Sequence, residues 1–499
     1  MPLEQEYISC DAHDGGPDLC MPTCRGVQIE ELSIVELQQH LTEGTFSARE
    51  LTASYLLRIE RINSILKAVI ETNPDALDIA GDLDSERLTG KIRSPLHGIP
   101  FLVKDNMGTG DKMQTTAGSS VLAGATTPEA NVVSLMRQTG AVLLGHANLS
   151  EWASMRSSYY SEGYSSRGGQ CRNPYNLAEH PGGSSCGSAV AVAANMCPFS
   201  LGTETDGSVI FPADRNGIVG LKPTVGLVST KGIIPEASSM DTVGPMGRSV
   251  QDVAVVMDAM TGKFQTGNRS TVTYSSFISQ RDALKGARFG LPWQRVWKMA
   301  SENEKLKIHY ETLKAVIADM KSAGAEIFEG ADFPSAKEII PPTGWDWEYA
   351  PEDKPYLSEF NIVRTEFYNG LQEYLSNLIT NPNQIKTLED VVAYNQRHAE
   401  AEGGYPNIHP CWPSGQDNFE KSVGSKGTKN EQYREALTFI QQKSRKEGID
   451  AALYWENSKL DGLLVPIQAE NGVACQVAAK AGMSTSFPFI GRWMILIVG

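Results

Sequence analysis

Apolar positions in the first part of the chain recur with helical spacing. Ser33 and Glu36 have the spacing of a capping box, which predicts a helix that begins there and that Gly44 can close. Ser47 and Glu50 repeat the pattern ahead of a second apolar stripe. The members of this stripe are Leu51, Tyr55, Leu56, Ile59 and Ile62. The pattern therefore predicts two consecutive amphipathic helices.

Farther along, strand patterns alternate with helical ones. A helix predicted over 129–138 ends near Gly140, and a buried-strand pattern follows at 141–145. The alternation returns later as a strand at 287–291, a helix over 303–323 and strands at 325–328 and 463–465. Strands interleaved with helices are typical of an α/β protein. We therefore predict a mixed, mostly parallel twisted sheet with helices on both faces.

The chain shows no internal repeat and no long low-complexity linker. Its 499 residues are 41% hydrophobic, which is enough for a large core, and one large domain accounts for them best. We predict an N-terminal extension over 1–27 and the main domain over 28–499. Two segments, 340–360 and 400–430, are rich in Pro, Gly, Trp and charge, and are predicted to be loops over the core.

The charge balance and the cysteines limit the partners and the compartment. A formal charge of -15 argues against nucleic acid or an anionic membrane as the main partner. No apolar run approaches the roughly 20 residues that span a bilayer, and 1–17 does not resemble a secretory signal. Cys20 and Cys24 resemble half of a zinc site, but no second pair with ligand spacing follows. We predict a cytoplasmic protein with reduced thiols and no metal, while a secreted mature form stays open.

Three short stretches carry the candidate chemistry, namely 98–106, 182–188 and 202–208. They supply Ser184 and Ser208, which lie 24 positions apart, and Lys104 after an apolar run. Neither serine stretch contains a histidine. A serine attacks an amide only if a base removes its proton, and a lysine kept neutral by burial can be that base.

Each stretch also has a plainer interpretation. The Gly/Ser cluster could be a turn with a helix cap, or a phosphate-binding loop that lacks its usual Lys-Ser/Thr end. Residues 183–187 fit the nucleophile elbow of α/β-hydrolases with Ser185 as nucleophile, but 172–181 contains two prolines and predicts no preceding strand. Lys104 could extend to the surface, and Ser208 could be a turn residue. The order and spacing of all three stretches favour one shared site.

On these motifs the chain resembles the amidase signature family. The matching stretches are 98–106, 181–189, 202–208 and 217–224. The resemblance is strong from about residue 30 to 260, with a signature core over 90–260, and looser from 280 to 480. Three stretches are most similar to stand-alone peptide amidases, namely 148–152, 167–170 and 202–208.

The resemblance implies a Ser-cisSer-Lys triad without cofactor or metal. Lys104 would be the base, Ser184 the bridging serine on a cis peptide bond, and Ser208 the nucleophile. Backbone N–H groups of 205–208 would form the oxyanion hole, with the substrate-binding residues Thr205, Asp206 and Gly207. The lysine pKa must then fall by roughly three units from about 10.4, which burial can supply.

The function that follows is hydrolysis of linear carboxamides through a serine acyl-enzyme. The substrates implied are primary amides, such as peptide C-terminal amides or aryl and fatty amides. One alternative is the glutamine-amidase subunit of a tRNA-dependent amidotransferase. Another is a catalytically weak relative that binds without efficient turnover. A homodimer also stays open.

Three departures from the family pattern affect these expectations. Cys186 stands where many members have Gly, and Asp214 and Arg215 stand where small or apolar residues are commoner. After residue 482 the C-terminal end is shortened, because 484–499 fits the expected strand and long helix poorly. We expect this to expose a sheet edge that the apolar run 493–498 patches only in part, with reduced stability or self-association.

Overall fold

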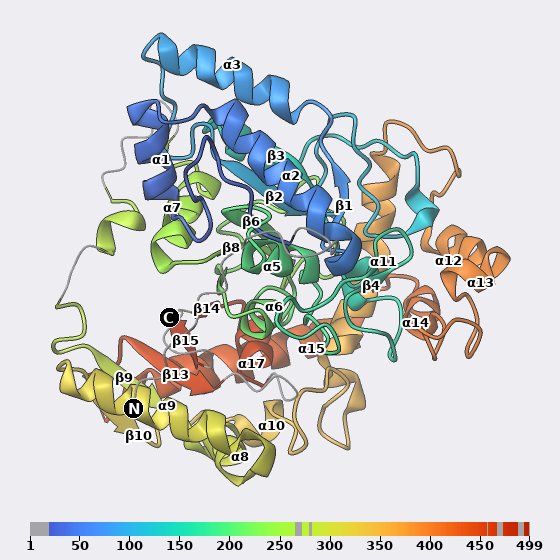
Figure 1. The fold of residues 1–499 in the computed structure, drawn as a ribbon. Helices are drawn as coiled ribbons and strands as arrows, with labels where there is room; N and C mark the ends of the chain where they lie inside the picture. The colour runs from blue at the N-terminus through green and yellow to red at the C-terminus, as the bar shows by residue number, and fades with distance from the viewer. Residues whose placement is uncertain are drawn as a thin grey trace.

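The computed structural model describes residues 19–264, 272–278, 282–456, 458–466, 473–487 and 494–498. Within these residues a single 11-stranded sheet runs through the molecule and helices pack around it (Figure 1). In order across the sheet, the strands are β1 (Val69–Thr72), β3 (Val142–Ala147), β2 (Pro100–Lys104), β6 (Phe199–Glu204), β8 (Thr242–Gly247), β7 (Val219–Lys222), β14 (Ser484–Phe487), β15 (Met494–Val498), β13 (Gly462–Pro466), β9 (Arg288–Leu291) and β10 (Glu326–Glu329).

The sheet is mixed, as predicted, and its parallel strands lie in two runs. One run is β3-β2-β6 and the other is β13-β9-β10. Antiparallel pairs join the two runs through β8, β7, β14 and β15, and β1 adds an antiparallel edge. The predicted class, a single α/β domain built on one sheet, is confirmed.

The described part of the C-terminal segment lies inside the sheet. β14 pairs with β7, and β15 pairs with both β14 and β13, so the sheet edges are β1 and β10. The expectation that the chain after residue 482 leaves an exposed edge is therefore wrong. The apolar run is partly outside the described residues, but its described part, 494–498, forms an interior strand. Predicted self-association through this segment loses its physical reason, since an interior strand has both neighbours.

Local sequence signals set the ends of the first helices. The box of Ser33 and Glu36 caps α1 (Ile34–Glu43), and Gly44 ends it with a φ of 71°. The box of Ser47 and Glu50 caps α2 (Ala48–Leu66). Both predicted capping boxes are confirmed, because each pair of side chains bonds the N–H groups that a helix start leaves free.

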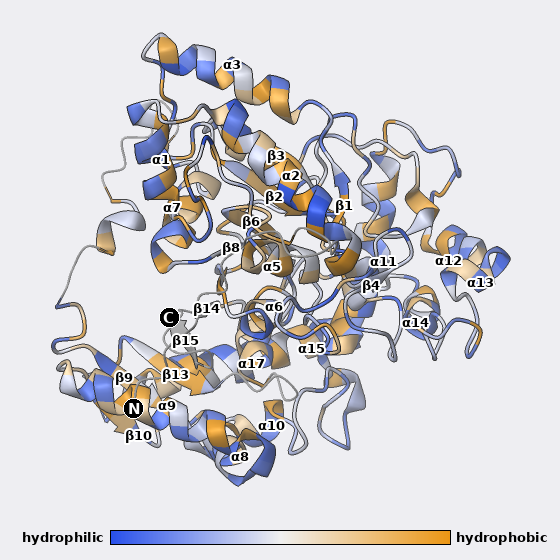
Figure 2. Ribbon diagram, in the orientation of Figure 1, coloured by the Kyte–Doolittle hydropathy of each residue, from blue (hydrophilic) through white to orange (hydrophobic). Residues whose placement is uncertain are grey.

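Helices cover both faces of the sheet near its centre. Every residue of β2, β3 and β8 is buried, and successive side chains of a strand point to opposite faces. The covering helices include α5 (Cys186–Ala193), which contacts β2, β3, β6 and β8, and α7 (Val250–Met260), which contacts β7 and β8. Figure 2 shows the apolar character of these central elements.

A second apolar cluster combines helices of the C-terminal half with apolar residues from 117–125, 149–155 and 234–240. These helices are α11 (Glu359–Ser376), α12 (Leu388–Arg397), α14 (Asp417–Ser425) and α15 (Glu431–Gln441). The prediction of a loop over 400–430 holds for 403–416 but is wrong for α14, which buries Phe419 and packs on α11. Of the loop predicted over 340–360, the part over 340–354 is a loop, and a short helix (Pro355–Leu357) and the start of α11 follow it. Met21 and Cys24 pack into the main core, and the division between 1–27 and 28–499 stays a prediction.

The cysteines differ in part from the prediction of reduced thiols. Among the described residues six cysteines are free, and five of these are buried. Cys20 takes part in a disulfide, so the prediction is wrong for this residue. No group of three or more His, Cys, Asp or Glu suited to a metal ion occurs among the described residues. None of the described helices is both long and apolar enough to cross a bilayer.

Candidate active site

Lys104 is the last residue of β2 and is fully buried. Its Nζ lies 2.7 Å from Oγ of Ser184. It also lies 2.9 Å from Oγ1 and 3.2 Å from the carbonyl oxygen of Thr203. Thr203 belongs to β6, the parallel neighbour of β2. The pairing of β2 with β6 therefore places Lys104 beside Thr203, and the Lys104 side chain also contacts Ser184.

The surroundings of Lys104 favour its neutral form. Burial lowers the pKa of Lys104 to about 8, and the ionised fraction of Glu236 acts against this shift. A lysine with this pKa is uncharged in a large part of the population at mildly alkaline pH. Burial thus supplies most of the fall of roughly three pKa units that a lysine base would need.

Ser184 follows Gly183 through a cis peptide bond, as the resemblance implied. The Ser150 N–H donates to the Ser184 carbonyl oxygen at 3.0 Å. A Cβ on Gly183 would come within 1.9 Å of the Glu162 carboxylate, so any side chain at this position would displace Glu162. The backbone of 183–184 is thus fixed close to Lys104.

The turn that carries Ser208 is held from both sides. The Ser185 N–H donates to the Ser208 carbonyl oxygen at 3.0 Å. The Glu204 carboxylate accepts from the N–H groups of Val209 and Ile210 at 2.7 and 2.9 Å. Gly207 adopts a φ of 77°, a conformation that side chains disfavour. Within the described chain, the N–H groups of 205–208 donate no hydrogen bond, which leaves them available to a ligand.

A cavity of about 220 Å³ contains the predicted serines and the turn between them. Ser184, Ser208 and 205–207 line it, whereas Lys104 lies behind Ser184. Part of the cavity wall is largely apolar. Phe211 comes from the chain just after Ser208, and the other members come from the C-terminal half, namely Trp345, Trp347, Val363 and Cys475. Ser208 is 7% exposed and Ser184 only 1%, so Ser208 is the more accessible hydroxyl.

Ser185, the alternative nucleophile, does not have this access. Its hydroxyl is fully buried and donates to the Thr203 carbonyl oxygen at 3.1 Å. It is also absent from the described lining of the cavity. The nucleophile-elbow interpretation therefore has no support in the geometry.

Acidic side chains in the cavity wall were not predicted. Glu162, Glu236 and Glu359 line the cavity, and burial raises the pKa of each. The Trp345 indole N–H donates to the Asp206 carboxylate at 2.5 Å, which ties the loop before α11 to the turn of Ser208. These three glutamates come from separate chain segments, and no motif spacing connects them with one another or with Asp206, which lies in the 202–208 stretch.

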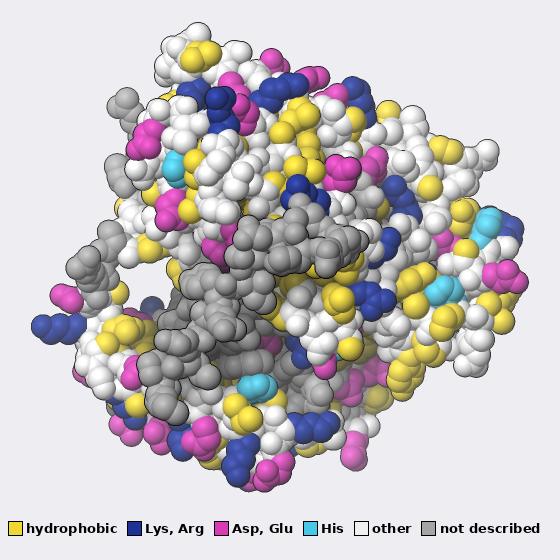
Figure 3. Space-filling model, viewed as in Figure 1, with side chains coloured by type: hydrophobic (Ala, Val, Ile, Leu, Met, Phe, Trp, Pro, Cys, Tyr) yellow, Lys and Arg dark blue, Asp and Glu magenta, His cyan; other side chains and the backbone are white. Residues whose placement is uncertain are grey.

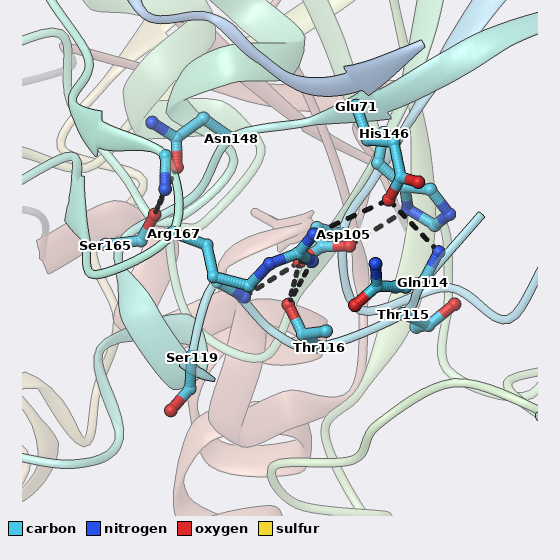
Figure 4. Close-up of polar contacts among 12 residues, drawn as sticks. Glu71, Asp105, Gln114, Thr115, Thr116, Ser119, His146, Asn148, Ser165 and Arg167 are labelled. Carbon is cyan, nitrogen blue, oxygen red and sulfur yellow. Dashed lines mark hydrogen bonds and ion pairs between the residues drawn. The ribbon is translucent and has the colours of Figure 1, made fainter. Parts of the chain in front are cut away.

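A buried polar network supports the chain next to Lys104 (Figure 4). The carboxylate of Asp105 accepts from the Thr116 hydroxyl at 2.6 Å and from the Gly118 N–H at 2.9 Å. His146 Nδ1 lies 3.2 Å from the other carboxylate oxygen, and Arg167 approaches within 4.0 Å. Burial lowers the pKa of His146 and raises that of Asp105, so burial disfavours the charged form of both groups. The charged form of Asp105 is stabilised only by the donors that surround it.

We expect Asp105→Ala to lower the free energy of unfolding by about 3 kcal/mol or more, because it leaves several buried donors without an acceptor. Denaturant unfolding of the purified variant measures this loss. Asp75→Ala is the matched control, since Asp75 pairs with Lys112 at the surface, where an ion pair adds little. Equal losses in the two variants would contradict the assigned support role.

Comparison with known proteins identifies the family. The family model described as Amidase matches residues 50–403. The chain belongs to the amidase family. An amidase-family protein of Schizosaccharomyces pombe is 45% identical over 478 residues, which cover 93% of this chain and 80% of that protein. The family prediction is confirmed, and with it the enzyme class, a hydrolase that acts on amides.

Solved amidase structures share the fold. The peptide amidase of Stenotrophomonas maltophilia is 34% identical with a TM-score of 0.79, and the match covers 94% of this chain and 93% of that one. An amidase family protein of Bacillus anthracis is 30% identical with a TM-score of 0.77, covering 94% and 88%. A glutamyl-tRNA(Gln) amidotransferase component of Symbiobacterium thermophilum is 38% identical over 62% of this chain and 62% of that protein.

Proposed function

We propose that this protein is a serine amidohydrolase that uses Lys104, Ser184 and Ser208. The contact that carries the proposal is the 2.7 Å separation of Lys104 Nζ and Ser184 Oγ, directly behind the cavity that Ser208 lines. A buried lysine that contacts a serine hydroxyl and no acidic partner at that distance is suited to act as a base. Burial lowers its pKa to about 8, so that much of it is neutral at mildly alkaline pH.

The proposed reaction proceeds through an acyl-enzyme. Neutral Lys104 takes the proton of Ser184, which takes the proton of Ser208 as its Oγ attacks the amide carbon. The C–N bond then breaks, and the same proton passes back through Ser184 to the leaving nitrogen. Water repeats the sequence to release the acid. In the described structure no hydrogen bond joins Ser208 to Ser184. Catalytic hydrogen bonds of this kind commonly tighten only when substrate is bound.

The turn over 205–208 is the proposed oxyanion hole. Its backbone N–H groups donate to no group of the described chain and belong to residues that line the cavity. Donors fixed in advance stabilise the negative oxygen of the tetrahedral intermediate without reorganisation. Thr205, Asp206 and Gly207 are therefore proposed to bind substrate through the main chain.

The proposed substrates are linear primary carboxamides, with peptide C-terminal amides as the first class to test. The largely apolar wall of the cavity and the similarity to peptide amidases support this choice. No Lys, Arg or His occurs among the described residues that line the cavity. A carboxylate next to the reacting carbon would therefore meet Glu162 and Glu236 without a cation to pair with.

Labelling with a fluorophosphonate probe, followed by peptide mapping, tests the proposed nucleophile. We expect one adduct, on the tryptic peptide that contains Ser208. An adduct on Ser185 would instead support the α/β-hydrolase chemistry. Prior incubation with a peptide amide should slow the labelling, because both occupy the same cavity.

The alternative of an amidotransferase subunit has its own test. Glutaminase activity that appears only after addition of partner subunits would favour it over a stand-alone amidase. Cytoplasmic location stays a proposal as well. Charges of both signs are interspersed over the face shown in Figure 3. We propose no nucleic-acid partner, and a homodimer stays open.

A further inference from the structure

A second and smaller cavity lies beside the proposed active site. It has a volume of about 50 Å³, and we refer to it as the inner cavity. It shares Ala153, Thr205 and Glu236 with the larger cavity, so the two cavities are neighbours. Thr203, which accepts from Lys104, and Asn106, which donates to Thr203, also line it. The inner cavity is therefore next to the place where the amide nitrogen leaves.

The inner cavity is rich in hydrogen-bond acceptors. Asn106 Oδ1 and Thr242 Oγ1 have no hydrogen-bond partner in the described chain, although their side chains are 3% and 0% exposed. Both residues line the inner cavity. None of the described residues in this lining is Lys, Arg or His. Buried polar atoms are nearly always satisfied, so these oxygens call for a small ligand that donates hydrogen bonds.

The two carboxyl groups of the inner cavity share one hydroxyl. Thr205 Oγ1 lies 2.9 Å from Glu236 Oε2 and 2.6 Å from Asp241 Oδ1. Asp241 also accepts from the N–H groups of Glu236 and Ala237, which favours its ionised form. The Thr205 hydroxyl has a single proton, which it donates in the hydrogen bond to Asp241. Glu236 is then protonated and donates a hydrogen bond to Thr205 Oγ1. Burial and the nearby Asp241 charge raise the pKa of Glu236 to about 8, which agrees with this arrangement.

We propose that the inner cavity binds ammonium, the nitrogen product of amide hydrolysis. Ammonium offers four N–H donors, and the lining offers the Asn106 amide oxygen, the Thr242 hydroxyl and the Glu236 carboxyl as acceptors. A cavity of about 50 Å³ exceeds the share of one water, about 30 Å³, and is too small for the body of an amide substrate. The inference rests on the proposed function, because that reaction releases ammonia at this point.

Each proton in this step has a source and an acceptor. Ammonia leaves the acyl-enzyme with its own two hydrogens and the proton that came from Ser208. In the inner cavity it takes the Glu236 proton, which gives ammonium and an ionised Glu236 carboxylate. The two opposite charges then lie in contact, and solvent returns the proton to Glu236 when ammonium departs. No oxidant, reductant or further reactant is needed.

Thermal unfolding of the Ser208→Ala variant tests ammonium binding without turnover. We expect ammonium chloride to raise the Tm relative to equal concentrations of potassium, sodium and tetramethylammonium chloride, because a ligand that binds only the folded state stabilises it. A titration gives the ammonium Kd. Equal shifts with potassium would identify a general monovalent-cation site and overturn the assignment to ammonium, as would the absence of any shift.

A matched pair of substitutions locates the site. Thr242→Val removes an unpartnered buried hydroxyl from the inner cavity, and Thr52→Val removes one from α2 in the core. In the Ser208→Ala background we expect the first to weaken ammonium binding about tenfold or more, the size of one hydrogen bond to a charged group, and the second to leave it unchanged. Equal effects would overturn the location. Because these proteins form no acyl-enzyme, the result is independent of the probe labelling that tests the proposed function.

Discussion

Ser208→Ala should abolish amide hydrolysis while the fold stays intact. Removal of a nucleophile costs about a millionfold in kcat in well-studied serine hydrolases, because the remaining groups cannot form the acyl-enzyme. The Ser208 side chain is small and lines the cavity, so its loss leaves no large void. Hydrolysis of a peptide amide, followed by ammonia release, measures the loss, and the unfolding curve should be nearly unchanged.

Ser185→Ala is the matched control for this experiment. It removes a neighbouring hydroxyl that is bonded to the Thr203 carbonyl oxygen and has no access to the cavity. We expect it to lower the free energy of unfolding by about 1 kcal/mol and to keep turnover within about tenfold. If Ser185→Ala is as inactive as Ser208→Ala, or if Ser208→Ala retains normal turnover, the assigned nucleophile is wrong.

Features of the fold and of the site that neighbouring residues determine could be predicted from the sequence. The capping boxes of α1 and α2, the glycine turns around Ser184 and Ser208, and the apolar strand before Lys104 each depend on neighbouring residues. Their chemistry is set by backbone conformations that few residue types allow. The resemblance of the motifs then joined the three stretches into one site.

The parts that depend on long-range packing could not be predicted. Glu162, Glu236 and Asp241 look like surface acids in the sequence, and only the folded chain buries them beside Lys104. A sequence rich in Pro, Gly and charge gave no sign of α14, whose Phe419 is fixed by packing on α11. The interior position of β15 depends on pairing with β13 and β14, which no local pattern of 494–498 contains.

Lys104 should control the pH dependence of the enzyme. The base must be neutral to accept a proton, so kcat/KM should rise as the pH increases through about 8 and then stay high. Lys104→Met keeps most of the side-chain volume but removes the base, and we expect kcat/KM to fall by about 10²–10⁴. The remaining activity should lack the rise near pH 8. Initial rates measured over this pH range, at substrate concentrations below KM, follow both effects.

Lys222→Met separates loss of the base from loss of a buried lysine. Lys222 ends β7, is as buried as Lys104 and has a pKa that burial also lowers, but it lies 3.4 Å from the Met240 carbonyl oxygen and is not in the described lining of either cavity. We expect this variant to be less stable, yet to keep the rise of kcat/KM near pH 8. Loss of that rise in Lys222→Met, with its retention in Lys104→Met, would transfer the role of base to Lys222. Burial lowers the pKa of both lysines, and the contact of Lys104 with the Ser184 hydroxyl, which lines the cavity, is the reason to assign the base to Lys104.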